Sequence, residues 1–191
     1  FMSDKFQLLL KQIRFPEEHD AFKEIKDGSI ETVKLFKSKR QWFFAFSFPS
    51  VLSYESFVLF DSLLHSSFDS LGAKASFEIR LFSTSCDDSL LGDYFSYALD
   101  SLKVSHFSIY SLFSNLKVEI SNNSICVKAP AHIIKENLQD RFISLISKSL
   151  SQVGLSDVSI SVLEDKEASS SIEEAYDCLL YTSPSPRDRS L

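Results

Sequence analysis

The spacing of apolar side chains along this chain alternates between a helical period and a strand period. Residues 3–13 carry an apolar stripe at helical spacing that begins beside an aspartate. Pro16, followed by two glutamates, suits the first turn of a second short helix that ends near Gly28. We therefore expect a small N-terminal helical unit over residues 3–28.

From Ser29 onwards the period is two, which is typical of β-strands. The stretch 30–48 is predicted to form a β-hairpin, and alternate positions of its second strand carry four aromatic residues: Trp42, Phe44, Phe46 and Phe48. A helix should follow, with Ser53 as its N-cap and Gly72 as its C-terminal cap. A third strand over 77–81 completes a β-β-α-β order.

The second half repeats this pattern after a helical stretch over 87–113. Two short strands flank a tight turn at Asn122–Asn123, and one long helix runs from about Ile134 to the cap at Gly154. A last strand lies at 158–162. The two halves are either repeats of one unit or two instances of a common hairpin-plus-helix arrangement.

These elements predict an α+β fold in which mixed or antiparallel sheets pack on helices. We expect five segments along the chain, divided as follows: the helical unit 3–28, the first β-β-α-β unit with its helices 29–113, the second unit 114–164, an acidic disordered linker 165–177, and a tail 178–191. The tail contains CLLYTSPSPRD, which resembles a translated sequencing adapter, so we exclude it from the fold. Phe1 before Met2 suggests upstream reading frame, and the natural protein is expected to continue past Tyr176.

Composition narrows the class of protein. The chain has 191 residues, 44% of them hydrophobic, and a formal net charge of −6, so it can bury a core and does not coat nucleic acid with its whole surface. Cys86 and Cys126 lie far apart without a CxxC spacing, which argues against a disulfide framework or a zinc site. Without a leader or a long apolar run, we expect a cytoplasmic chain that does not enter a membrane.

No arrangement of residues typical of an enzyme stands out. The histidines are scattered, at positions 19, 65, 106 and 132, and the paired acids fall at expected helix starts or in the linker. Neither GxGxxG nor GxxxxGK is present among only four glycines. We expect no catalytic, cofactor-binding or metal-binding residue here, and no small-molecule ligand.

The turn of the first hairpin is the one candidate binding site. It carries four cations and no acid: Lys34, Lys37, Lys39 and Arg40. These side chains could contact phosphate oxygens, and Lys23 and Lys26 could extend the patch; alternatively, the charges only keep the turn soluble. The aromatic strand could offer stacking faces, but its alternation and the covering helix favour a place in the core.

The order of these segments resembles a known family. The segments that carry the likeness are KFQLLLKQI, IETVKLFKSKRQWFFAFSFPSVLSYESFVLF and FDSLGAKASFEIRLF, followed by LKVEISNNSICVKAPAHIIKENL and GLSDVSISVLED. Together they are similar, over residues 3–165, to the N-terminal domains NI and NII of PolC-type DNA polymerase III alpha subunits of low-GC Gram-positive bacteria. In that family an OB-fold, a PHP domain, a 3′–5′ exonuclease and the polymerase follow, and none of their catalytic motifs lies in this stretch.

The resemblance implies a non-catalytic part of a DNA replicase that recruits or positions other components. Its expected partners are replisome proteins, such as a clamp-loader subunit, or DNA, and the parent polymerase would use divalent metal. The alternative is a free-standing KH-like or sheet-based protein that binds single-stranded nucleic acid. That alternative lacks the GXXG loop of KH domains.

Overall fold

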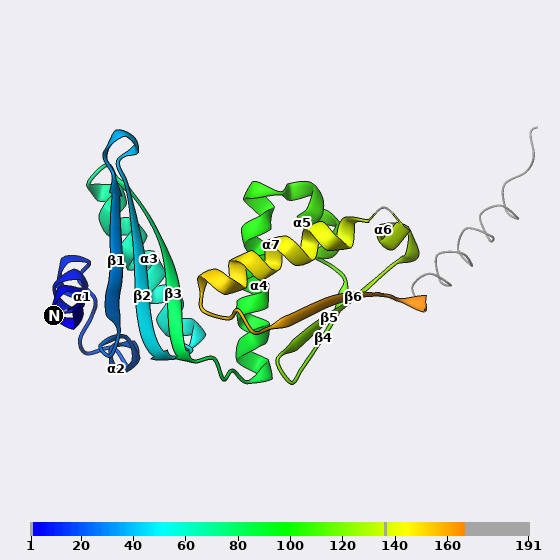
Figure 1. Cartoon of the computed structure of the whole chain (residues 1–191), viewed down its shortest axis with the longest axis horizontal. Helices are drawn as coiled ribbons and strands as arrows, with labels where there is room; N and C mark the ends of the chain where they lie inside the picture. The colour runs from blue at the N-terminus through cyan, green and yellow to red at the C-terminus, as the bar shows by residue number, and fades with distance from the viewer. Residues whose placement is uncertain (1, 136, 167–191) are drawn as a thin grey trace, which may run out of the picture.

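The computed structural model describes residues 2–135 and 137–166 and contains two three-stranded sheets with helices packed on them (Figure 1). The first sheet and its helices comprise α1 (Met2–Gln12), α2 (Ala21–Ile25), β1 (Ser29–Phe36), the 3-10 turn η1 (Lys37–Lys39), β2 (Gln41–Ser50), α3 (Tyr54–Ser70) and β3 (Lys74–Ser83). The second comprises α4 (Asp88–Ser105), α5 (Phe107–Phe113), β4 (Lys117–Ser121), β5 (Ser124–Ala129), α6 (Ala131–Lys135), α7 (Leu138–Gln152) and β6 (Ser159–Glu164). The predicted α+β class is confirmed.

Both sheets have the same topology. In each, the middle strand pairs antiparallel with the strand before it and parallel with the strand after it. A parallel pair needs a crossover connection, which α3 supplies in the first sheet and α6 with α7 in the second. The β-β-α-β order predicted for both halves is therefore confirmed. The limits assigned to the domains stay a prediction, and residues 167–191, with most of the linker and the whole tail, lie outside the described residues.

The alternating aromatic residues of β2 form the centre of the first core. Phe44, Phe46 and Phe48 are buried, and Trp42 packs half-buried against Phe68 of α3. Helix α1 covers the same face of the sheet through Phe6, which contacts Phe46 and Phe48 edge-on. The predicted place of these four aromatic residues in the core is confirmed.

The predicted helix and turn ends are also found. Ser53 caps α3 by accepting a hydrogen bond from the Ser56 backbone N–H at 3.4 Å. Gly72 and Gly154 end α3 and the turn after α7 with positive φ angles of 69° and 91°, which suit a residue without a side chain. The Asn122–Asn123 turn has φ angles of 47° and 63°, the left-handed pair of a tight hairpin turn.

Two helix predictions were wrong. The second helix begins at Ala21 rather than at Pro16, because residues 16–20 form turns instead. The long helix of the second half is two helices, α6 and α7, separated at Asn137. Asn137 has a left-handed φ of 57°, which asparagine adopts at low cost and which an α-helix cannot continue through.

Helix α4 packs against both sheets' helices and joins the two halves. Tyr94 on α4 is buried, and its hydroxyl donates a hydrogen bond to the Leu52 carbonyl at 2.8 Å. On the other side, Phe95 of α4 meets Phe142 of α7 edge-on, and Phe113 of α5 stacks on Phe142 with ring centroids 4.1 Å apart. In residues 2–135 and 137–166, none of the helices combines the length and hydropathy of a membrane span. A cytoplasmic location stays a prediction.

A histidine–aspartate pair on α3 makes stability depend on pH. His65 Nδ1 lies 3.0 Å from Asp61 Oδ1, and this hydrogen bond raises the pKa of His65 from 6.5 to about 9. Because the pKa is raised in the folded state, the stabilisation is complete below about pH 6.5 and is lost as the pH rises through 9.

We expect His65→Gln to lower the free energy of unfolding below pH 6.5 and to have no effect above pH 10. The loss should stay under about 1 kcal/mol, because the His65 side chain is 44% exposed and solvent screens the pair. Urea unfolding at a series of pH values measures this. Asp61→Asn should remove the same pH dependence, and a wild-type pH profile in either variant would contradict the assignment.

Candidate nucleic-acid interface

The tip of the first hairpin lies at one end of the first sheet, at the top of Figure 1. Strands β1 and β2 are joined there by η1 and by Arg40, whose left-handed φ of 49° turns the chain into β2. The Arg40 backbone N–H closes this turn on the Lys37 carbonyl at 3.3 Å. The turn carries three cationic residues, and the side chains of all three are exposed: Lys37, Lys39 and Arg40.

The fourth predicted residue, Lys34, lies on β1 three residues before Lys37, and its side chain is also exposed. Its Nζ lies 5.8 Å from the ring centroid of Phe43, at a distance suited to a cation–π contact. The structure thus brings three of the four predicted cations together at the turn and places the fourth beside them on the sheet.

Sequence reasoning missed Lys74, which joins this group. Lys74 begins β3, and its backbone N–H donates a hydrogen bond to the Arg40 carbonyl at 2.9 Å. The Lys74 side chain is exposed. Asp69, near the C-terminal end of α3, is an acid at this same end of the unit. We call Lys37, Lys39, Arg40 and Lys74 the basic tip.

The suggested extension of the patch through Lys23 and Lys26 is wrong. Lys23 lies on α2 and Lys26 directly follows it. This helix packs at the opposite end of β1 from the tip (Figure 1). That end is acidic, and Lys23 already lies 3.9 Å from Asp20. The acids of this segment are Glu17, Glu18, Asp20, Glu24 and Asp27. The first unit is therefore polarised, with a basic tip at one end and acids at the other.

One face of the first sheet is bare in the part of the chain that the structure describes. Helices α1 and α3 cover the face that carries the buried aromatic residues, and no described helix lies over the other (Figure 1). Near the α2 end of this bare face, Arg80 pairs with Glu31 at 2.6 Å and with Glu78 at 3.1 Å. Those charges satisfy one another, and the other two strand cations of this face, Lys34 and Lys74, lie toward the tip.

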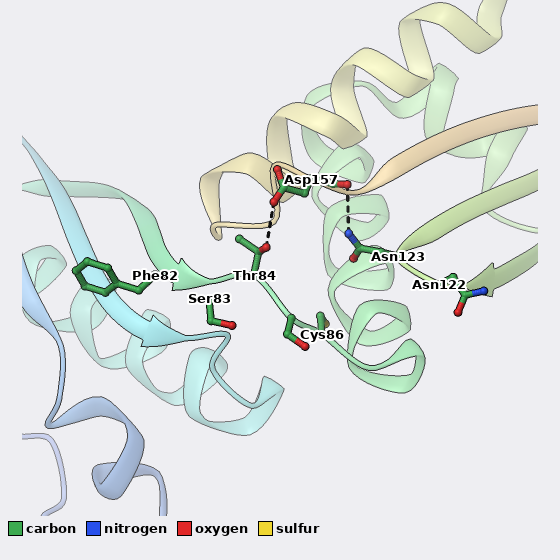
Figure 2. Close-up of a pocket in the computed structure, with 8 residues that line it drawn as sticks. Phe82, Ser83, Thr84, Cys86, Asn122, Asn123 and Asp157 are labelled. Carbon is green, nitrogen blue, oxygen red and sulfur yellow. Dashed lines mark hydrogen bonds between the residues drawn. The ribbon is translucent and has the colours of Figure 1, made fainter.

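A second candidate surface lies where the chain passes from the first half to the second. A hollow of about 630 Å³ lies there, and Figure 2 shows residues that line it. Thr84 donates a hydrogen bond to Asp157 Oδ2 at 3.0 Å, and Asn123 Nδ2 donates one to the Asp157 carbonyl at 3.2 Å. These bonds tie the connection to the hairpin turn of the second sheet. Cys86 also lines the hollow.

The chemistry of this hollow does not suit a nucleophilic site. Burial, with Asp87 and Asp88 nearby, raises the pKa of the Cys86 thiol to about 11, so it stays protonated at neutral pH. Asp157 is engaged by Thr84. Among the described residues, no group of three histidine, cysteine or acidic side chains could hold a metal ion. The hairpin end of the first unit is the better candidate for binding.

Two family profiles match the chain in series. The family described as DNA polymerase III polC-type N-terminus I matches residues 5–79, and the one described as DNA polymerase III polC-type N-terminus II matches residues 93–177. The basic tip lies within the first match.

Curated relatives agree with these profiles. The chain is 74% identical over 176 residues to the DNA polymerase III PolC-type of Streptococcus thermophilus LMD-9 and 27% identical over 176 residues to that of Streptococcus agalactiae serotype III. Each alignment takes in 92% of this chain, which spans 12% of the length of each relative. The chain therefore belongs to the PolC-type DNA polymerase III family and corresponds to its N-terminal region.

Proposed function

We propose that this chain is the non-catalytic N-terminal part of a replicative DNA polymerase and that its basic tip holds nucleic acid in position for the rest of the protein. The family membership and the name of the relatives support the first part. The second part rests on the geometry of the first unit, in which the basic tip is the site that fits a polyanion.

The polarisation of the first unit carries this proposal. The basic tip gathers four exposed cations from η1, the residue that follows it and the start of β3, within a chain whose net charge is −6. The acidic segment around α2 lies at the other end of the same strands. A polyanion is attracted to one end and repelled from the other, so it is both bound and oriented.

The fold gives less support to a free-standing KH-like protein. KH domains hold the nucleic-acid backbone with a GXXG loop, and the chain has only four glycines, none of them in that pattern. At this tip the phosphates would instead meet the side chains of η1 and its neighbours. A replisome protein such as a clamp-loader subunit stays a predicted partner, and an acidic surface on it would suit the same tip.

The test replaces Lys37, Lys39 and Arg40 together with alanine. All three side chains are exposed, so the fold should be retained, and the loss of three phosphate contacts should weaken nucleic-acid binding by about tenfold or more at low salt. Fluorescence anisotropy with labelled oligonucleotides measures the affinity of the wild-type chain and of the variant.

The matched control replaces Lys23 and Lys26 with alanine, which also removes exposed lysines but at the acidic end. This control should bind as the wild-type chain does. Equal affinities for the triple variant and the wild type would refute the role of the tip in nucleic-acid binding, and the predicted protein partner would then become the first candidate.

A further inference from the structure

The bare face of the first sheet carries two phenylalanines close to the basic tip. Phe36 ends β1 and is 48% exposed, and Phe43 lies on the central strand and is half-buried. In the antiparallel register, Phe36 lies opposite Gln41 and Lys34 lies opposite Phe43. Residues that face one another across such a pair share a face, so Lys34, Phe36 and Phe43 all lie on the bare face.

The two rings are diagonal neighbours on adjacent strands. Diagonal positions of an antiparallel pair lie about 7–8 Å apart, which leaves both rings within reach of one short stretch of nucleic acid. The exposed edge of the sheet at Phe36 has no described helix over it (Figure 1). The exposed apolar surface of Phe36 is in contact with water, so a ligand that covers this ring would gain free energy by removing that surface from water.

Cations surround these rings. Lys34 lies over Phe43, η1 follows Phe36 directly, and Lys74 begins the neighbouring strand opposite Gln41. Farther from the tip, the face is occupied by the ion pairs of Arg80 with Glu31 and Glu78. Phe82 is also exposed at that far end, but the cation beside it, Arg80, is already paired with acids. Among the described residues of this face, exposed rings beside cations without such an ion pair are therefore found in the half next to the tip.

We propose that this half of the bare face binds single-stranded nucleic acid, with unpaired bases stacked on Phe36 and Phe43 and the phosphates held by Lys34 and the basic tip. The inference rests on the proposed nucleic-acid contact and specifies the ligand as single-stranded rather than duplex nucleic acid. Stacking on a sheet requires bases that are free of a partner strand, so a duplex can reach the cations but not the rings. Charge complementarity with phosphate selects this occupant for the face.

The test uses Phe36→Leu in the 191-residue chain. Leucine keeps an apolar side chain at the exposed end of β1 but removes the ring, so affinity for a single-stranded oligothymidylate should fall by about 5- to 100-fold. Affinity for a duplex of the same length should not change, and neither should the salt dependence of binding. Phe36→Tyr keeps an aromatic ring and should bind the single strand with the affinity of the wild type.

Phe107→Leu is the matched control, because Phe107 is a 62% exposed phenylalanine on α5 in the second half. It should leave both affinities unchanged. A 2-aminopurine placed within the oligonucleotide adds a direct readout, since stacking on a ring changes its fluorescence, and Phe36→Leu should reduce that change.

The outcomes separate this inference from the proposed function. If Phe36→Leu binds single strands as the wild type does while the basic-tip variant still weakens binding, the stacking inference is wrong and the proposed function stands. Equal wild-type affinity for single strand and duplex would also overturn the stacking inference. If the wild-type chain shows no salt-dependent binding to either nucleic acid, both proposals fail.

Discussion

Replacing Phe46 with alanine should lower the free energy of unfolding by about 3–5 kcal/mol, a cost typical of truncating a buried phenylalanine. Phe46 is 0% exposed and sits at the centre of the first core. Its ring centroid lies 5.1 Å from that of Phe60, 5.6 Å from that of Phe77 and 5.7 Å from that of Phe6. Alanine would leave a cavity that three different elements border. Since domains are stable by only about 5–15 kcal/mol, urea unfolding should show a large shift of the midpoint.

Phe82→Ala is the control for this measurement. Phe82 lies on β3 of the same sheet but is 84% exposed, so its truncation should change the free energy of unfolding by no more than about 0.5 kcal/mol. If Phe46→Ala cost no more than Phe82→Ala, the central place of the β2 aromatic residues in the core would be wrong.

Replacing Gly154 with alanine should lower the free energy of unfolding by about 2–4 kcal/mol, because two penalties add. Gly154 has a φ of 91°, which is strained for any side chain. A Cβ at this position would lie 2.5 Å from Leu81 Cγ and 3.3 Å from the Ile79 carbonyl oxygen. Both contacts are on β3, so the clash falls where the end of α7 meets the first sheet.

Gly72→Ala separates the two penalties. Gly72 also has a positive φ, of 69°, but a Cβ there would meet only Arg40 Nη1, at 3.8 Å. This variant should carry the conformational strain alone, about 1–2 kcal/mol. Urea unfolding of both variants gives the difference, which measures the close approach at β3. Equal costs at the two glycines would contradict the close contact between the halves.

Much of the fold follows from local patterns that the sequence displays directly. The switch to a period of two at Ser29 and the alternating aromatic residues of β2 determine the first hairpin, because only one of their faces can be buried. Gly72 and Gly154 mark the helix ends, since their positive φ angles exclude most other residues. These signals are local, so a single sequence is enough to find them.

The errors have identifiable causes. The apolar stripe of the second half continues in phase through Asn137, and periodicity alone cannot show that this residue takes a left-handed conformation. Pro16 with two glutamates is a good helix start, but the chain there turns to bring Phe15 into the core, where it is 6% exposed. Tertiary packing overrides the local preference in this segment.

The candidate site was predictable only in part, because its members meet through a parallel strand pair. Lys37, Lys39 and Arg40 lie within four residues of sequence and were visible as a group, whereas Lys74 reaches Arg40 only through the crossover of α3. Phe43 carried a usable signal, since it is out of phase with the other aromatic residues of β2 and must face the opposite side. The distance of Lys23 from the tip follows from the length of β1, which separates the two ends.

The salt dependence of nucleic-acid binding tests the central claim most directly. Each phosphate contact contributes about 0.7–0.9 to the slope of log affinity against log salt concentration. The wild-type chain and the variant that lacks Lys23 and Lys26 should therefore share one slope, and the variant that lacks Lys37, Lys39 and Arg40 should have a slope shallower by about 2 to 3. An identical slope in all three proteins would contradict the claim that the basic tip contacts nucleic acid.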